Sequence, residues 1–160
     1  MQKINYIPTA DEAYNKYSAL CARQECCRHD LAEKMVRKGM SEQAIATVLE
    51  QLTSEGFIDE ERFCRAFIHD KLHFSKWGKI RLRTELRMRR IAHETIEQCL
   101  REIDDEDYMD ILKELLQAYT PTVTAKSSYE MQCKIVRFAY QHGFEQALSL
   151  PLAESLAGQL

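Results

Sequence analysis

The chain has 160 residues, a formal net charge of −3 and no run of about 18 apolar residues, which argues against a membrane-spanning segment. The first residues carry one lysine and no apolar stretch of the kind a secretory signal needs, so we expect a cytoplasmic protein. Six cysteines form no C-x-x-C pair, which argues against a zinc site or a disulfide framework. We therefore expect no metal and no cofactor, and we expect most of the cysteines to be small buried apolar residues.

Signals for the start and end of helices follow one another along the chain, and no segment alternates polar and apolar residues as a strand would. Thr9 with Glu12 predicts a helix start after Pro8, and Asp59 predicts another. Ser127, with a glutamate three residues later, predicts a third start. Helix ends with a left-handed glycine followed by an apolar residue are predicted at three positions: Gly39, Gly56 and Gly143.

The apolar pattern repeats along the chain. A shift of 51 positions overlays residues 31–52 on 82–103, with these pairs: Leu31/Leu82, Met35/Leu86, Met40/Ile91, Ile45/Ile96, Val48/Cys99, Leu49/Leu100 and Leu52/Ile103. A further shift of about 53 places Ile135, Ala139 and Phe144 in a weaker third copy. After Phe144 the pattern is lost, and Pro151 is expected to interrupt or restart the last helix.

These patterns predict an all-α fold of three tandem three-helix repeats, each resembling a helix-turn-helix unit. We expect an N-terminal lead-in over residues 1–9 and repeats over 10–57, 58–103 and 104–160. The first helices of the repeats are expected near 10–24, 59–74 and 104–119. Because a unit of about 50 residues buries little surface alone, neighbouring repeats should pack together into an elongated, curved array.

Positive charge is concentrated in the second repeat. Residues 71–90 contain eight basic side chains and one acidic one, a formal excess of seven. The predicted helix over 79–91 points Leu82 and Leu86 into the core and lines up four cations on one flank: Lys79, Arg83, Arg87 and Arg90. Lys76 and Trp77 precede them. The expected site for a phosphate or an acidic protein groove is therefore Lys76, Trp77, Lys79, Arg83, Arg87 and Arg90.

An ordinary structural interpretation stays open for this segment. Arginine-rich helix faces are common on solvated surfaces, and a tryptophan packs against its neighbours more often than it stacks on a base. Arg81 and Arg89 lie on other sides of the predicted helix and are second choices.

The sequence resembles the RecX family of bacterial regulators of the RecA recombinase. The resemblance is carried by residues 55–72, Glu-Gly-Phe-Ile-Asp-Glu-Glu-Arg-Phe-Cys-Arg-Ala-Phe-Ile-His-Asp-Lys-Leu, and by 76–86, Lys-Trp-Gly-Lys-Ile-Arg-Leu-Arg-Thr-Glu-Leu. It extends over about residues 12–150. Three positions differ from the family pattern: Cys27 replaces a capping serine, Cys64 replaces an alanine, and Arg90 replaces a glycine.

The resemblance implies three three-helix units and a protein that binds the RecA filament on single-stranded DNA. Such a protein inhibits the recombinase, ATPase and co-protease activities of the filament. Contact with the DNA itself is expected to be weak and salt-dependent. No coiled-coil seam argues for a dimer, so we expect a monomer.

The sequence also offers some support for two other functions. A regulator that binds DNA directly would use the basic helix as a recognition helix, but the chain is slightly acidic and has no second helix as basic. An enzyme would need a catalytic or metal site. His69 and His73 are four residues apart on a helix, but no H-E-x-x-H glutamate and no evident third ligand accompany them, so catalysis is not expected.

Overall fold

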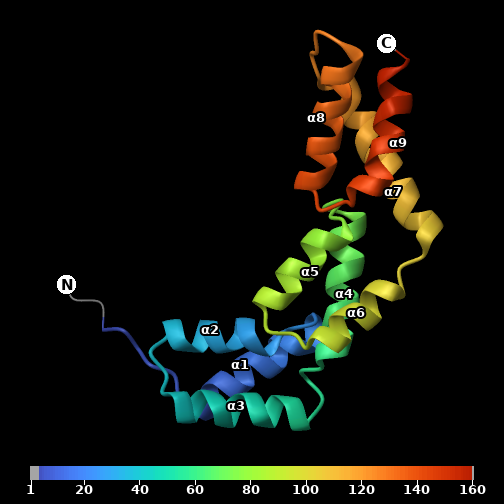
Figure 1. Cartoon of the computed structure of the whole chain (residues 1–160). Helices are drawn as coiled ribbons and strands as arrows, with labels where there is room; N and C mark the ends of the chain where they lie inside the picture. Colours follow the sequence, from blue (N-terminus) through green and yellow to red (C-terminus); the bar gives the residue numbers. More distant parts are fainter. Residues whose placement is uncertain (1–3, 160) are drawn as a thin grey trace. The chain divides into compact units, whose positions relative to one another are not determined.

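The computed structural model describes residues 4–159, which form nine α-helices and one short 3₁₀ turn without any strand (Figure 1). The helices are α1 (Ala10–Arg23), α2 (Arg28–Arg37), α3 (Glu42–Ser54), α4 (Glu60–His73), α5 (Lys79–Met88), α6 (His93–Arg101), α7 (Asp105–Tyr119), α8 (Ser128–Gln141) and α9 (Gln146–Ala157), with the turn at Thr120–Thr122. The all-α prediction is confirmed. Residues 1–3 of the expected lead-in, and residue 160, lie outside the described part of the chain.

The chain divides into two compact units, and α4 contributes to both. The first unit extends to Ala66 and also includes Arg89–Ile91. The second consists of Phe67–Met88 and the chain from Ala92 onward. The repeat boundaries expected from the sequence remain a prediction beside this division.

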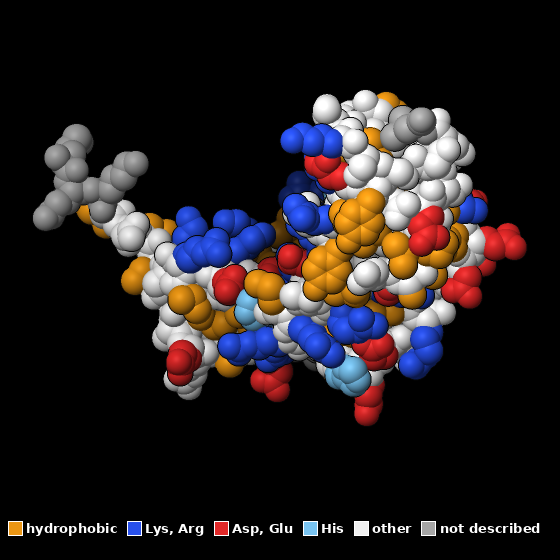
Figure 2. Space-filling view, turned by 45° about the horizontal axis from the view of Figure 1, so that its top comes forward, with side chains coloured by type: hydrophobic (Ala, Val, Ile, Leu, Met, Phe, Trp, Pro, Cys, Tyr) orange, Lys and Arg blue, Asp and Glu red, His pale blue; other side chains and the backbone are white. Residues whose placement is uncertain are grey.

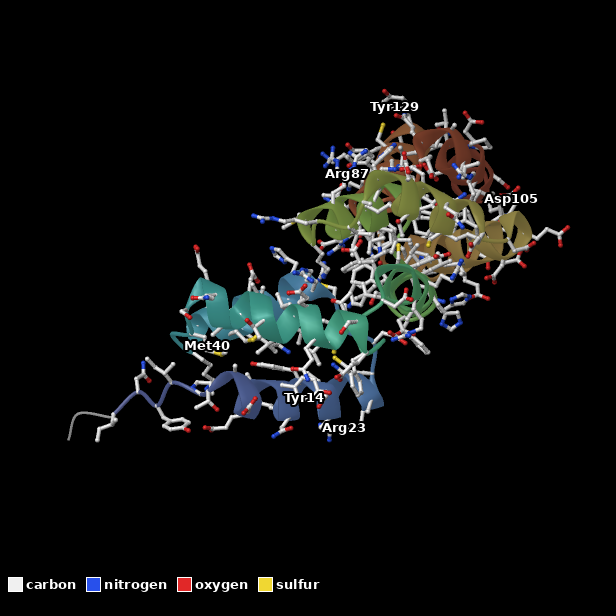
Figure 3. All side chains as sticks on the ribbon, turned by 90° about the horizontal axis from the view of Figure 1, so that it is seen from below. Tyr14, Arg23, Met40, Arg87, Asp105 and Tyr129 are labelled. Atoms are coloured by element: carbon white, nitrogen blue, oxygen red, sulfur yellow. The ribbon has the colours of Figure 1, made fainter. Side chains whose placement is uncertain are left out.

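The first unit is built on α1, α2 and α3, which pack around one apolar core. Leu31, Met35 and Leu52 are fully buried there, together with Tyr17 and Val48. Figure 3 labels Tyr14 on α1 and Met40 after α2, both of which contribute to this core. The apolar stripe of each helix is therefore used for packing within the unit.

The second unit contains a C-terminal bundle of α7, α8 and α9, which lie side by side in Figure 1. Leu112 and Leu116 from α7 meet Ile135 from α8 in its core. From α9, the small side chains of Ser149 and Ala153 are fully buried. Small residues permit a close approach of the helix backbones, and this packing explains how the last helix is held.

The predicted helix starts are present. The Thr9 hydroxyl accepts a hydrogen bond from the backbone N–H of Glu12 at 3.2 Å, and the Asp59 carboxylate accepts one from that of Arg62 at 2.9 Å. The Ser127 hydroxyl accepts one from the backbone N–H of the third residue after it at 3.1 Å. At the start of α2, Cys27 Sγ accepts a bond from the Asp30 N–H at 3.4 Å, so a thiol occupies the place of the usual hydroxyl cap. Thiols are weak acceptors, which makes this cap weaker.

The second helix of every repeat ends in the same way. Gly39, Arg90 and Gly143 follow α2, α5 and α8, and their φ angles are +82°, +57° and +93°. The residues after them are buried. The residue after each of the two glycines donates its backbone N–H to the carbonyl five residues earlier, Met40 to Met35 at 3.2 Å and Phe144 to Ala139 at 3.0 Å. The equivalence of these turns supports the tandem three-helix repeat.

Two expectations about helix ends were wrong. The basic helix was expected over 79–91, but α5 ends at Met88, because the chain turns left-handed at Arg90. Pro151 was expected to interrupt or restart the last helix, but it lies inside α9. The buried faces of Ser149, Ala153 and their neighbours pack against the bundle, and this packing compensates for the backbone hydrogen bond that a proline removes.

The repeat overlay places core residues at equivalent positions. Every residue of the pairs between 31–52 and 82–103 is buried except Ile103, which is half-buried. Cys99 is buried, as its alignment with Val48 predicted. Of the six cysteines, four are buried, Cys21 is half-buried and Cys133 is exposed.

Candidate partner-binding surface

The basic helix α5 is held at its N-terminus by the turn between α8 and α9. The Gly78 N–H donates to the His142 carbonyl at 2.7 Å, and the Ile80 N–H donates to the Gly143 carbonyl at 2.9 Å. A β-carbon on Gly78 would lie 2.4 Å from the backbone carbonyl of Gly143, so only glycine permits this approach. The first turn of α5 therefore has its free N–H groups satisfied by the third repeat.

Tyr108 from α7 completes this junction. Its hydroxyl accepts a hydrogen bond from the Lys79 N–H at 2.9 Å and donates one to the Glu145 carboxylate at 2.8 Å. Burial raises the pKa of Tyr108 far above its usual value, with the Glu145 carboxylate adding to the shift. The Lys79 ammonium lies 4.9 Å from the centre of the same ring, so this predicted site residue is engaged in a cation–π contact.

Lys76 lies in the link between α4 and α5. Its φ angle is +54°, and its carbonyl lies 3.0 Å from His142 Nδ1, which must carry the proton because a carbonyl only accepts. Its ammonium lies 3.6 Å from the Glu114 carboxylate. Lys76 is therefore fixed by its backbone and partly neutralised at its tip.

Trp77 is surrounded by cations. The Lys71 ammonium lies 4.9 Å and the Arg81 guanidinium 4.1 Å from the centre of the indole ring. The Phe67 ring meets it edge-on, with 6.1 Å between the centroids. Trp77 thus gathers two positive charges beside each other. Both cations lie over the Trp77 ring, so a nucleic-acid base could stack on the ring only if one of them moved.

Arg83 is paired with a carboxylate. Its guanidinium donates to Glu97 on α6 through two nitrogens, at 2.6 Å and 3.3 Å. The Arg83 guanidinium holds the pKa of Glu97 below its usual value, and the same bond raises the pKa of Arg83. This predicted site residue is committed to joining α5 to α6, and it carries little uncompensated charge.

Arg87 and Arg90 are both exposed. Arg87 projects from the last turn of α5 and is labelled in Figure 3. Among the described residues, neither has a carboxylate within ion-pair distance of 4.0 Å. Arg90 belongs to the first unit, where it lines a hollow of about 360 Å³ with His29 and Glu33 from α2. The next residue back, Arg89, pairs with Asp30 at 3.3 Å.

The basic stripe in the structure therefore differs from the predicted one in its members. Lys79, Arg83 and Arg87 do share the α5 helix, whereas Arg90 lies beyond its end. Lys71 and Arg81 were missed as primary candidates, although both cations lie free of ion pairs among residues 4–159. On the face drawn in Figure 2, basic and acidic side chains are interspersed.

His69 and His73 do not form an open pair of metal ligands. Their rings lie 4.5 Å apart, but His73 uses Nδ1 at the His69 carbonyl, at 2.8 Å, and Nε2 at the Asp107 carboxylate, at 2.9 Å. Both nitrogens of His73 are thus engaged in linking α4 to α7. A metal would have to displace one of these partners.

Comparison with known proteins identifies the family. The model of the RecX family for its second three-helix domain matches residues 59–100. The Regulatory protein RecX of Pseudomonas putida is 35% identical over 98 residues, which are 61% of this chain and 68% of that protein. The chain belongs to the RecX family. The Regulatory protein RecX of Lactobacillus johnsonii is 27% identical over 120 residues.

The RecX fold is found in solved structures as well. The crystal structure of RecX from Lactobacillus salivarius has a TM-score of 0.76 with 16% identity, and the match covers 92% of this chain and 96% of that one. The chain spans less than half of the L. johnsonii RecX, 44% of its length. In the described part of this RecX-family chain, no helix is long and apolar enough to cross a membrane.

Proposed function

We propose that this RecX-family chain binds the RecA filament on single-stranded DNA and inhibits its recombinase, ATPase and co-protease activities. Membership of a family whose proteins are named as regulators supports a regulatory role. The observation that carries the proposal is this membership, together with exposed and unpaired cations in the repeat that the family model matches. A partner of this filament would act in the cytoplasm.

The proposed contact residues are those of the basic segment. Lys76, Trp77, Lys79, Arg83, Arg87 and Arg90 are the set expected from the sequence, and their environments rank them. Arg87 and Arg90 are exposed and unpaired, so they are available for phosphates or carboxylates of the filament. Arg83 has Glu97 as its partner, and we assign it the role of supporting α5. Lys71 and Arg81 join the set as cations gathered by Trp77.

Direct regulation by duplex binding is less well supported. A recognition helix reads bases with its N-terminal residues. In α5 that end packs against the third repeat, since the N–H groups of Gly78 and Ile80 donate to the α8–α9 turn and that of Lys79 donates to Tyr108. This packing counts against α5 as a recognition helix, and any contact with bare DNA should be weak and fall steeply with salt.

The test is binding to immobilised single-stranded DNA with and without a coat of the RecA from the same organism. We expect binding to the coated strand to be at least about tenfold tighter than to the bare strand, a difference of roughly 1.4 kcal/mol. Arg87→Glu should weaken binding to the coated strand several-fold, because it reverses an exposed unpaired charge. Arg101→Glu on α6, also exposed, is the matched control and should bind as the wild type does. Equal binding to coated and bare strands would contradict the proposal.

A further inference from the structure

Helix α8 has two apolar faces. One points into the bundle, and the other is largely exposed, although its Val136 also packs partly against the core. Met131, Ile135 and Ala139 point into the bundle and are buried. A second stripe runs along the outside at spacings of i, i+4, i+7 and i+11: Tyr129, Cys133, Val136 and Tyr140. Tyr129 is 75% and Tyr140 62% exposed (Tyr129 is labelled in Figure 3). A solvated helix face is normally polar, so the two exposed tyrosines have no explanation in the packing of residues 4–159.

The stripe forms one side of a groove. Together with α9 it borders an open hollow of about 620 Å³, to which α9 contributes Leu150, an apolar side chain that is 39% exposed. The four residues of the stripe span three helical turns, about 16 Å along α8. A groove of this length between two helices fits one further helix laid along it.

The charge of the groove favours a protein over a nucleic acid. Arg137 is the one charged side chain that lines it, and the other lining residues are aromatic, aliphatic, thiol or amide groups. A strand of nucleic acid carries a phosphate at each nucleotide, so a groove that binds it needs a series of cations along its length. One arginine among tyrosines and aliphatic groups is instead the composition of the energetic centre of a protein–protein interface.

We propose that the α8–α9 groove is the docking site for an amphipathic helix of the RecA filament, with apolar side chains along the stripe and a carboxylate opposite Arg137. This inference rests on the proposed function. It adds a second contact surface, in the third repeat, to the basic segment of the second repeat.

The first test measures co-sedimentation of the chain with RecA filaments on single-stranded DNA. Tyr129→Ser/Tyr140→Ser and, separately, Arg137→Glu should each weaken binding about tenfold or more, as loss of central aromatic or arginine contacts does. Arg137→Lys should retain most of the binding, because it keeps the charge. Ile4→Ser is the control, since Ile4 is an exposed apolar residue ahead of α1, 93% exposed, that lines neither this groove nor the hollow beside Arg90. All the substituted residues are exposed. The helix content of each variant is checked by circular dichroism.

The second test uses Cys133, the one exposed cysteine of the six. Filaments should slow its reaction with a maleimide several-fold, whereas bare single-stranded DNA should leave the rate unchanged. Loss of binding in the groove variants together with protection of Cys133 supports the inference. If the groove variants bind filaments as tightly as the wild type, or if bare DNA protects Cys133, the inference about the groove is overturned. The proposed function would not be affected by either result. Failure of the wild type to bind filaments overturns both. A free wild-type dimer that Tyr129→Ser/Tyr140→Ser converts to monomer assigns the groove to a second copy and overturns the inference.

Discussion

At the scale of single residues, the left-handed turn at Arg90 stores conformational strain. An L-residue other than glycine, asparagine or aspartate pays about 1–2 kcal/mol in this conformation, and the two equivalent turns use glycine. We expect Arg90→Gly to raise the free energy of unfolding by about 1 kcal/mol, measured by urea denaturation. Gly56→Ala is the reverse case, since Gly56 has a φ of +79° and no atom near its would-be β-carbon. It should lower stability by a similar amount, and a stabilising Gly56→Ala would contradict the strain argument.

The Arg83–Glu97 pair predicts a pH dependence. The pKa of Glu97 is lowered in the folded state, so its contribution to stability is present above its unfolded value and is lost as the pH falls through the folded value. Glu97→Gln should therefore be less stable than the wild type near pH 7, by up to about 1 kcal/mol. The difference should vanish in acid, below the range where the carboxylate titrates. Urea unfolding of both proteins at a series of pH values measures this, and a difference that persists in acid would show that the pair is not its source.

The hydroxyl of Tyr108 is predicted to stabilise the junction between α5 and the third repeat. Tyr108→Phe removes the acceptor of the Lys79 N–H and the donor to Glu145, which should cost about 1–3 kcal/mol. The control is Tyr119→Phe, because Tyr119 stacks on Phe138 through its ring, with 3.7 Å between the centroids. Thermal unfolding should show a clear drop in Tm for the first variant and little change for the second. Equal effects would mean that the Tyr108 hydrogen bonds contribute nothing specific.

At the scale of the elements, Gly78 sets the distance between α5 and the α8–α9 turn. Gly78→Ala would place a methyl group 2.4 Å from backbone atoms of Gly143, which cannot move aside as a flexible side chain would. We expect a loss of about 3 kcal/mol or more in unfolding free energy. At Gly158, near the C-terminal end of α9, the nearest atom to a β-carbon would be 3.4 Å away, so Gly158→Ala should be close to neutral. A neutral Gly78→Ala would mean that the junction is not closely packed.

The elements themselves were largely predictable from the sequence. Caps such as Asp59 and left-handed glycines such as Gly39 act through local chemistry, so the pattern identifies them directly. The ends of α5 and α9 were not predictable in the same way. The left-handed Arg90 replaces the usual signal for a helix end, and Pro151 is tolerated through packing that involves residues distant in sequence.

At the scale of the whole molecule, the candidate site was predicted less well than the fold. The stripe on α5 was inferred from helical periodicity alone, which cannot show that Glu97, on the next helix, neutralises Arg83. Nor can it show that Lys71 and Arg81 converge on Trp77. These partners depend on how helices pack. The sequence contains the apolar residues of the α8 stripe, but only the structure shows that its two tyrosines are exposed. The elongated, curved form of the array and the monomeric state stay predictions.

The most direct test of the central claim is the single-stranded-DNA-dependent ATPase of the cognate RecA, titrated with this chain. We predict that the wild type suppresses turnover at ratios well below one chain per RecA protomer. Arg87→Glu should require several-fold more protein for the same effect, and Arg101→Glu should match the wild type. Full RecA turnover at a molar excess of the wild-type chain, under salt conditions in which the filament is intact, would contradict the account.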